Sequence, residues 1–426
     1  MITRALYVAA WAIALPAALV RLAWRSRWQA GYRANMGERL GRYPTSVESG
    51  APLIWVHAVS VGETRAAAPL IEALLAKYPD HRFLLTHMTP TGRATGEALF
   101  GDRVERAWLP YDMPFAVRGF LDRYRPAAGI LLETEVWPVL LEECRRRGIP
   151  TLLANARLSE RSARRYARWP ALAAWAFGNI TRVAAQADED AGRLGALGAR
   201  RVEVTGNVKF DVPVDPVLVQ RGRSLREAFG APPVWIAGST REGEEAALLD
   251  ALPAHGPARL LLVPRHPQRF EAVAQLARDK RLSLAARSTN FEGARSARVL
   301  LGDSMGEMFA YYAAADVAIM GGSLLPFGGQ NLIEAMAVGV PVVVGPHTYN
   351  FDEATRGAIA AGAAVRVKDA AEALECATAI AADAPRREAM SRAALAFVGQ
   401  HRGAVQRLAA AVQAMLDEAA SPSGRG

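Results

Sequence analysis

The chain has 426 residues, which is more than one ordinary hydrophobic core supports, so two domains are expected. With 51% hydrophobic residues, 22% charged residues and two cysteines, the composition excludes a collagen-like chain, a disulfide scaffold and a largely disordered chain. A net charge of +9 favours nucleic acid, anionic lipid or an acidic substrate as a partner, although a basic soluble surface alone would give the same charge.

The N-terminal segment is apolar and bounded by positive charge. Residues 5–20 carry no charged side chain, Arg4 precedes them, and Trp24 stands among the arginines that follow. Such flanks are typical of a membrane interface, with a buried helix or a signal peptide as alternatives. The run is slightly short for a span of roughly 20 residues, so it can cross the bilayer or lie in it. We expect residues 1–45 to be a membrane anchor with a basic connector, and residues 1–28 to be removable without loss of the soluble fold.

Apolar runs then alternate with amphipathic stretches. The predicted strands are 53–60, 82–88, 127–133, 151–157, 182–187, 202–207, 234–240, 258–265, 297–303, 316–322 and 340–346, and the predicted helices include 62–78 and 385–418. This alternation predicts parallel sheets with right-handed crossovers. The proline-containing segment 209–216 is a predicted linker, and the tail 421–426 is predicted to be disordered. We therefore predict an α/β protein of two doubly wound domains, 46–212 and 213–420, with the active site in the cleft between them.

Polar groups follow two strands of the first domain. Ser60, Gly62 and Glu63 stand where a strand becomes a helix, which aims the Glu63 carboxylate at the cleft. Positive helix-end charge is expected to keep that carboxylate ionised, and complementing the helix dipole is its alternative role. Glu133 and Glu135 share one face of an extended segment at another strand end, which alternatively is a solvated strand end.

Four arginines form one stripe of a predicted helix within residues 155–169. They are Arg161, Arg164, Arg165 and Arg168. Because Tyr166 and Trp169 accompany them, the stripe favours a phosphate-rich surface or a membrane interface. A solvated helix face explains the same spacing equally well.

Two corners of the second domain suit an anion. Ser239 and Thr240 stand at a strand end before a helix, where backbone N–H groups bind anions or a hydroxyl caps the helix. At the next corner, Pro264 and Arg265 present a guanidinium suited to phosphate, with a surface turn as the alternative.

The densest corner is the segment 321–347. Gly328 and Gly329 are expected to allow close approach of the backbone to a ligand. Asn331 and Glu334 share a helix face near its N-terminus, where the carboxylate can accept hydrogen bonds from ribose hydroxyls or simply complement the dipole.

Together, these motifs resemble the 3-deoxy-D-manno-octulosonic acid (Kdo) transferases of lipopolysaccharide synthesis. HAVSVGET, ETEVWP, NARLSERSARR, GNVKFD, PRHPQRF, SMGEMF, GGQNLIEAMAVGVPV and GPHTYNF occur in this order between residues 57 and 351. Each motif alone is weak, whereas their common order is specific. Gln330 and Leu332 depart from the family pattern, and the loop around Phe327 varies, which affects details of the donor contacts. The resemblance implies the GT-B fold of two Rossmann-like domains.

By the same resemblance, the chain moves Kdo from CMP-Kdo to the lipid A precursor, lipid IVA, with inversion at the anomeric centre. Glu63 matches the family's general base, and neither a metal nor another cofactor is implied. The expected partners are the lipid A precursor and anionic inner-membrane lipid at the cytoplasmic face, and no nucleic acid. The implied CMP contacts are Pro264, Arg265, Met305, Gly306, Glu307, Asn331, Leu332, Ile333 and Glu334, with Ser239, Thr240, Gly328 and Gly329 as an anion loop. The acceptor candidates are Ser60, Gly62, Glu135, Arg161, Arg164, Arg165, Arg168 and Lys209.

Two other functions fit parts of the pattern. A GT-B-fold sugar-nucleotide 2-epimerase would need neither a membrane anchor nor a base for an acceptor hydroxyl. A non-catalytic, membrane-bound nucleotide sensor would bind CMP without turnover, and it would have no use for Glu63.

Overall fold

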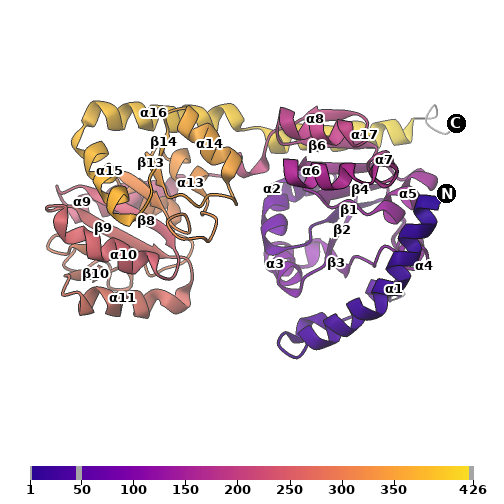
Figure 1. The fold of residues 1–426 in the computed structure, drawn as a ribbon, viewed down its shortest axis with the longest axis horizontal. Helices are drawn as coiled ribbons and strands as arrows, with labels where there is room; N and C mark the ends of the chain where they lie inside the picture. Colours follow the sequence, from indigo (N-terminus) through magenta and orange to yellow (C-terminus); the bar gives the residue numbers. More distant parts are fainter. Residues whose placement is uncertain (1, 45–49, 422–426) are drawn as a thin grey trace. The chain divides into compact units, whose positions relative to one another are not determined.

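Two parallel seven-stranded sheets, each covered by helices, form the two units of the computed structural model (Figure 1). The structure describes residues 2–44 and 50–421, so the predicted boundary at residue 45 and the tail after 421 lie outside the described residues. Unit 1 comprises Met1–Asp211 and Arg402–Gly426, and unit 2 comprises Val212–His401. The predicted pair of doubly wound domains is confirmed.

The sheet of unit 1 has the strand order β3-β2-β1-β4-β5-β6-β7. Its strands are β1 (Leu53–His57), β2 (Arg82–His87), β3 (Glu105–Trp108), β4 (Ala128–Leu132), β5 (Thr151–Ala156), β6 (Arg182–Ala185) and β7 (Val202–Val204). The helices are α1 (Ile2–Arg25), α2 (Val61–Lys77), α3 (Pro90–Phe100), α4 (Pro114–Tyr124), α5 (Pro138–Arg146), α6 (Glu160–Ala167), α7 (Pro170–Phe177), α8 (Asp188–Ala196) and α17 (Ala404–Ala420).

The sheet of unit 2 has the strand order β10-β11-β9-β8-β12-β13-β14. Its strands are β8 (Val234–Thr240), β9 (Arg259–Pro264), β10 (Leu284–Ala286), β11 (Val299–Leu301), β12 (Val317–Met320), β13 (Val342–Val344) and β14 (Ala364–Arg366). The helices are α9 (Pro216–Phe229), α10 (Glu244–Ala251), α11 (Phe270–Asp279), α12 (Met308–Ala313), α13 (Leu332–Ala337), α14 (Asp352–Ala360), α15 (Ala370–Ala382) and α16 (Ala384–His401).

In each sheet the strands are added first on one side and then, after a reversal, on the other. In unit 1 the reversal lies between β1 and β4, and in unit 2 it lies between β8 and β12. All strand pairs are parallel, so the carboxyl ends of the strands meet at one edge of each sheet. Ligands of such sheets bind at the carboxyl ends beside the reversal, and each unit therefore offers one such position.

Three strands that the sequence pattern did not predict lie at sheet edges. They are β3, β10 and β14. An edge strand has a neighbouring strand on one side only, and each of these three contains half-buried or exposed residues. Their hydrophobic runs are therefore too short and interrupted to stand out, whereas the fully buried β1, β4 and β5 were predicted.

The C-terminal helix α17 belongs to unit 1, which corrects the predicted second domain 213–420. The predicted helix 385–418 breaks at Gly403, whose φ of 92° ends α16 and starts α17. The Asp211 carboxylate accepts hydrogen bonds of 2.6 Å from the backbone N–H groups of Gly403 and Val405. Leu408 and Val412 then join the buried core of unit 1. Periodicity revealed the apolar face of this helix but not which sheet covers it.

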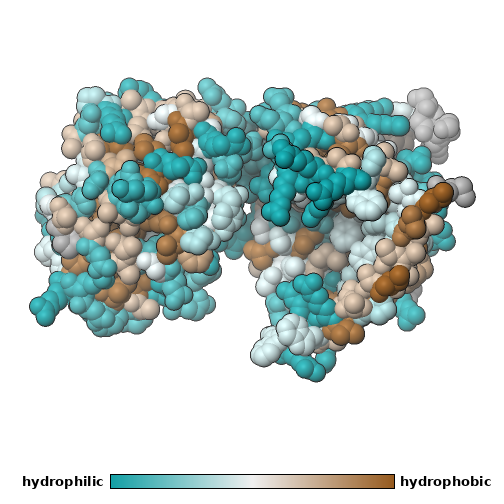
Figure 2. Space-filling view, in the orientation of Figure 1, coloured by the Kyte–Doolittle hydropathy of each residue, from teal (hydrophilic) through white to brown (hydrophobic). Residues whose placement is uncertain are grey.

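Helix α1 is long and apolar enough to cross a membrane by length and composition. One face packs on unit 1, where the Tyr7 hydroxyl donates a 2.9 Å hydrogen bond to Asp112 and Leu22 is buried. The opposite face carries exposed hydrophobic residues (Figure 2). Removal of residues 1–28 would uncover apolar surface of unit 1, so the expectation that this segment is dispensable for the fold is not supported.

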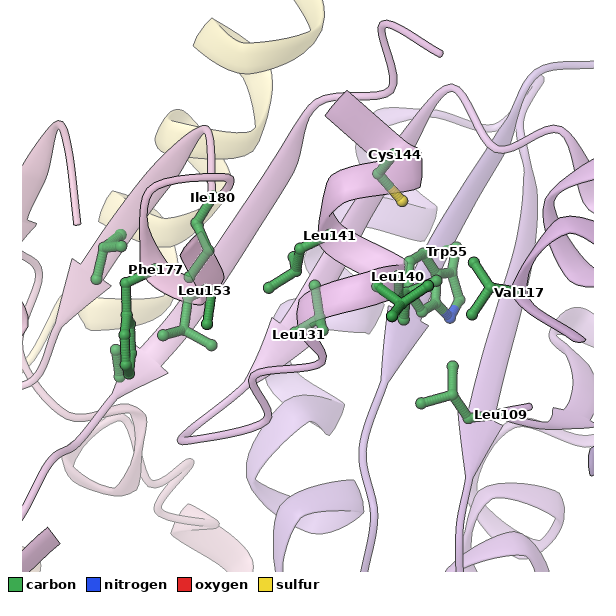
Figure 3. Packing of buried hydrophobic residues seen from close by; sticks show 14 of the residues in the cluster. Trp55, Leu109, Val117, Leu131, Leu140, Leu141, Cys144, Leu153, Phe177 and Ile180 are labelled. Carbon is green, nitrogen blue, oxygen red and sulfur yellow. The ribbon is translucent and has the colours of Figure 1, made fainter. Parts of the chain in front are cut away.

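The core beside β1 and β4 explains the fixed position of the strand ends. Trp55 of β1 is fully buried between Leu140 of α5 and Val117 of α4 (Figure 3). Its indole N–H donates a 2.8 Å hydrogen bond to the hydroxyl of Thr86 in β2. Strand β1 is thus held by both packing and a buried polar contact immediately before the segment that follows it, residues 58–63.

Candidate active site

Glu63 lies in the first turn of α2, directly after β1. Ser60 caps this helix, since its hydroxyl oxygen accepts a hydrogen bond from the Glu63 backbone N–H at 3.4 Å. The Glu63 carboxylate accepts in turn from the Ser60 hydroxyl at 3.2 Å and from the backbone N–H of Val59 at 2.7 Å. This reciprocal capping fixes a half-buried carboxylate beside the strand reversal of unit 1. Gly62, by contrast, is exposed, and a Cβ added there would meet only the Ser60 hydroxyl at 3.8 Å.

The electrostatics of Glu63 differ from the expectation based on the helix dipole. Burial, together with the carboxylates of Glu135 and Glu133, raises the pKa of Glu63 to about 7, although the hydrogen bond from the Val59 N–H acts to lower it. Burial and negative neighbours therefore outweigh positive helix-end charge. A carboxyl group with a pKa near neutrality suits a general base, because it is a stronger base than an ordinary carboxylate and is still largely ionised above neutral pH.

Glu135 lies near Glu63, after the neighbouring strand β4. The Trp137 indole N–H donates a 3.0 Å hydrogen bond to a Glu135 oxygen, and Nε2 of the buried His57 lies 3.7 Å from the same oxygen. Glu133, two residues earlier, has a left-handed φ of 57° that turns the chain at the strand end. The structure thus brings the two predicted carboxylate corners of the first domain together.

Lys209 joins this group from the turn Val208–Phe210. Burial lowers the pKa of Lys209, and the nearby Glu133 carboxylate opposes this effect only in part. Asn155, at the end of β5, accepts a 3.2 Å hydrogen bond from the backbone N–H of Val208 and holds that turn. Sequence reasoning missed Asn155, although its place at a strand end and its left-handed φ of 52° are typical of a functional corner.

The predicted arginine stripe forms a hollow on α6. The hollow has a volume of about 490 Å³ and is lined by Glu160, Arg161, Ser162, Arg164, Arg165 and Arg168. Arg164 forms a 2.5 Å ion pair with Glu160, and both side chains are exposed. Hydrophilic side chains gather over α6 on the face shown in Figure 2. The two predicted aromatic companions separate, because Tyr166 packs on Phe177 whereas Trp169 stays 68% exposed.

At the end of β8 in unit 2, Ser239 has a left-handed φ of 57° and interrupts the register with β9. Thr240 is buried, and its hydroxyl donates a 2.8 Å hydrogen bond to Glu245. Neither residue caps α10, whose N-cap is Gly243. Because the Thr240 hydroxyl is engaged, the predicted anion contact at this corner is left to Ser239.

A cationic cluster occupies the adjacent ends of β8 and β9. The Arg265 backbone N–H donates to the Thr240 carbonyl at 3.0 Å, while its half-exposed guanidinium makes no hydrogen bond or ion pair with the described residues. Arg241 donates a 3.3 Å hydrogen bond to His266 and stacks 4.8 Å over the ring of Phe327. Burial and then Arg241 and Arg265 lower the pKa of His266. Sequence reasoning missed Arg241 as a site residue, although it directly follows the Ser-Thr corner.

The glycine-rich loop after β12 is held by two contacts that the sequence did not reveal. The buried Glu244 carboxylate accepts hydrogen bonds from the backbone N–H groups of Gly322 at 2.7 Å and Leu324 at 3.0 Å. A Cβ at Gly328 would lie 2.4 Å from the Tyr349 ring and 2.5 Å from the Asn350 side chain. Gly328 is therefore required for packing of the chain against Tyr349 and Asn350.

Asn331 and Glu334 share a role at the start of α13. The Asn331 side chain caps the helix by accepting from the Ile333 backbone N–H at 3.1 Å, and its amide donates to Glu334 at 3.2 Å. Both residues are half-buried. The side chains of Leu332 and Ile333 are buried in the core, so these two predicted contacts can offer only backbone atoms to a nucleotide.

Glu307 anchors the loop between β11 and α12. Although burial raises its pKa, hydrogen bonds from Arg287, Ser304 and Arg221 lower it to about 2. The carboxylate is thus engaged within the protein. Met305, 59% exposed, and Gly306, with a φ of 80°, form the exposed tip that remains available to a ligand.

Within the described residues, no group of three or more His, Cys, Asp or Glu side chains is arranged to hold a metal ion. The corner of unit 1 holds carboxylates with Lys209, and the corner of unit 2 holds cations with backbone groups. Carboxylates suit removal of a proton from a hydroxyl, and cations with backbone N–H groups suit a phosphate that acquires negative charge.

Comparison with known proteins relates this arrangement to an enzyme family. Residues 34–212 match the family model described as 3-deoxy-D-manno-octulosonic-acid transferase (kdotransferase), and residues 273–397 match glycosyl transferases group 1. The chain is 47% identical to the 3-deoxy-D-manno-octulosonic acid transferase of Bordetella pertussis, over 93% of this chain and 97% of that protein.

Solved structures share the fold at low identity. A glycosyltransferase from Rickettsia africae has a TM-score of 0.57 at 13% identity, covering 88% of this chain and 100% of that chain. The UDP-GlcNAc 2-epimerase from Neisseria meningitidis bound to UDP-GlcNAc has a TM-score of 0.55 at 15% identity, covering 86% of this chain and 100% of that chain. Because a transferase and an epimerase share this fold, the fold alone does not select the reaction.

Proposed function

Since this chain belongs to the family of Kdo transferases, which are glycosyltransferases, we propose that it transfers Kdo from CMP-Kdo to the lipid A precursor, lipid IVA. The reaction proposed is inverting and needs no metal, with Glu63 as the general base. The observation that carries the proposal is the Glu63 carboxylate, held beside the strand reversal of unit 1 with a pKa raised to about 7.

The proposed chemistry begins at the acceptor hydroxyl. Its oxygen attacks the anomeric carbon of Kdo while Glu63 takes the hydroxyl proton, and the bond from the anomeric carbon to the phosphate oxygen breaks. The electron pair of that bond leaves with CMP, so the departing phosphate gains negative charge. Hydrogen bonds from the Ser60 hydroxyl and the Val59 N–H hold the Glu63 carboxylate in one orientation. The base is therefore already positioned for proton transfer.

Unit 2 supplies groups suited to the departing nucleotide. The guanidinium of Arg265 and the adjacent Arg241 present positive charge at the ends of β9 and β8. We assign the phosphate to this cluster, because charge-assisted contacts with arginine stabilise an oxyanion. We assign the ribose to Glu334, whose orientation is supported by the amide of Asn331. The exposed tip at Met305 and Gly306 is the proposed contact for the base.

Unit 1 supplies groups suited to a phosphorylated lipid. The four arginines that line the α6 hollow are proposed to hold the phosphates of the acceptor. The apolar helix α1 belongs to the same unit and is the proposed attachment to anionic inner-membrane lipid at the cytoplasmic face. Unit 1 thus carries the proposed base, the proposed acceptor site and the proposed membrane attachment.

The decisive experiment incubates the purified full-length protein with CMP-Kdo and lipid IVA, and measures product masses and released CMP. The expected result is lipid whose mass has increased by one or more Kdo residues, with one CMP released for each. Isomerisation of the sugar nucleotide without CMP release would overturn the proposal in favour of an epimerase. Binding of CMP without turnover would overturn it in favour of a sensor.

A further inference from the structure

Helix α1 is apolar on both of its faces, yet unit 1 covers only one of them. On the covered face, Tyr7 packs at 5.6 Å from Trp175 and Trp11 packs at 5.7 Å from Tyr111, and Leu22 is buried. The uncovered face presents large exposed side chains, namely Ile2 at 78%, Leu6 at 67%, Ile13 at 81%, Val20 at 69% and Trp24 at 58%. A helix that is apolar all round requires an apolar environment on both sides. The outer face of α1 must therefore be covered by an apolar environment other than unit 1.

The two ends of α1 are both tied to unit 1. In the first turn, Arg4 forms ion pairs with Glu142 at 2.9 Å and Glu143 at 3.6 Å. Just after the last turn, Tyr32 receives the guanidinium of Arg25 over its ring at 4.8 Å. The helix therefore lies along unit 1 over its whole length, which is about 36 Å for its 24 residues.

This contact decides between the two orientations that the sequence allowed. A helix of this length exceeds the hydrocarbon thickness of about 30 Å and could span a bilayer on its own. If α1 spanned, the part of unit 1 beside it would enter the hydrocarbon together with Glu142, Glu143 and their partners Arg118 and Arg146. Charged groups facing hydrocarbon are strongly unfavourable. The helix axis must therefore run parallel to the membrane surface.

We propose that α1 lies in the plane of the membrane surface, with its outer face in the bilayer and its inner face on unit 1, and does not cross the membrane. The flanking groups support a bilayer as the occupant. Trp24 ends the apolar face, and Trp28, which is 81% exposed, follows it together with Arg27. Indole rings and guanidinium groups prefer the headgroup region, with the apolar face deeper.

The same face of unit 1 carries the basic helix α6. Figure 2 shows hydrophilic side chains over α6 and hydrophobic side chains along α1 on one visible face of this unit. The arginines of the α6 hollow then lie beside a surface that carries lipid phosphates. This orientation deepens the proposed function, on which it rests only for the presence of a membrane acceptor.

The test measures the depth of α1 in vesicles. Leu6→Cys, Ile13→Cys and Val20→Cys are made separately in the full-length Cys376→Ser protein, where the remaining Cys144 is buried. Each variant carries a nitroxide label and is reconstituted into phosphatidylethanolamine and phosphatidylglycerol vesicles. The ratio of collision rates with oxygen and with a water-soluble nickel chelate then reports depth. A label on Arg392→Cys, an exposed position of α16, gives the value for water.

Residues 6 and 20 are separated by about 21 Å along the helix. An in-plane helix gives all three outer positions the same ratio, well above that of the Arg392→Cys control. A spanning helix gives a ratio that peaks at Ile13→Cys and falls toward both other positions, which would overturn the proposal. Ratios equal to the water control at all three positions would overturn it as well, since a second copy or solvent would then cover the face.

Transfer activity measured on the same vesicles separates the two proposals. Equal depths without Kdo transfer would leave the orientation standing and refute the proposed function. A depth peak at Ile13→Cys with Kdo transfer intact would refute the orientation alone.

Discussion

The Glu63 carboxylate accepts a 2.7 Å hydrogen bond from the backbone N–H of Val59, four residues earlier and outside helix α2, in whose first turn Glu63 lies. In the usual capping box, the acidic residue returns to the N–H of the capping residue itself. Here the Glu63 carboxylate accepts instead from the residue before the cap, Val59, so it connects the first turn of α2 to the segment that joins β1 to this helix. The residue proposed as the base is therefore also part of the corner that positions it.

Replacement of Glu63 by Gln is expected to lower kcat by about 10²–10⁴-fold, because Gln keeps the shape but cannot accept the hydroxyl proton. Steady-state transfer of Kdo to lipid IVA measures kcat. CMP affinity, measured by calorimetry, should remain unchanged, since the proposed nucleotide contacts lie in unit 2.

The matched control for this change is Ser60→Ala, which removes the helix cap but keeps the base. It should lower the free energy of unfolding by about 0.5–2 kcal/mol and affect kcat less than Glu63→Gln does. Near-parent turnover by Glu63→Gln would move the base to Glu135. Loss of CMP binding together with kcat would instead show that Glu63 maintains the structure.

The pH profile of the enzyme should reveal the same group. Because the pKa of Glu63 is raised to about 7, kcat/KM should rise with pH up to about 7 and then level off, as the carboxylate form accumulates. The contribution of Glu63 to the free energy of unfolding has the opposite pH dependence. Because the pKa of Glu63 is higher in the folded protein than in the unfolded chain, protonation of Glu63 stabilises the fold at low pH, and this stabilisation is lost as pH rises through about 7. Rate and thermal-unfolding measurements from pH 5 to 9 on parent and Glu63→Gln test both signs; a profile unchanged by the substitution would contradict the assignment.

Replacement of Glu334 by Ala is expected to weaken CMP binding. A lost hydrogen bond to a charged group is worth roughly 1.5–3 kcal/mol, which corresponds to about ten- to a hundredfold in affinity. Calorimetric titration with CMP gives the affinity. Glu372→Ala serves as control, because Glu372 is also the acidic residue in the first turn of a helix of unit 2. Equal affinities of the two variants would remove the ribose role from Glu334.

Replacement of Arg164 and Arg165 by Ala together should raise the KM for the phosphorylated lipid and leave CMP affinity unchanged. The α6 hollow loses two of its four arginines in this variant. Arg392→Ala removes a comparably exposed arginine with an acidic partner four residues away on α16, and it should change neither quantity. If the double variant retains the parent KM, the stripe is a solvated helix face.

Replacement of Tyr7 by Phe should lower the free energy of unfolding by about 1.5–3 kcal/mol, because the buried Asp112 carboxylate loses a hydrogen bond. Asp112 also accepts from the backbone N–H groups of Val139 and Leu140 and so caps α5. Denaturant unfolding of the full-length protein in detergent measures the change, and Tyr349→Phe, at a hydroxyl bonded to the exposed Pro326 carbonyl, is the control. A Tyr7→Phe variant as stable as this control would show that α1 contributes little to the fold.

Much of the architecture is local and was therefore predictable. The corner from Ser60 to Glu63 was placed between a strand and a helix because apolar runs and amphipathic periodicity change there within a few residues. The break between the units at Asp211 falls in the predicted linker 209–216, since prolines interrupt both periods. The ordered motifs gave the family, and the comparisons confirmed it.

Tertiary structure alone decided which surfaces meet and how charged groups behave. The apolar faces of α1 and α17 are visible in the sequence, but their partners are not, because periodicity identifies a face and does not identify what covers it. The pKa of Glu63 depends on burial and on Glu133 and Glu135, which stand about seventy residues later in the chain. Such effects act through space over a few ångströms, so they are determined only once the sheet has brought the ends of β1 and β4 together.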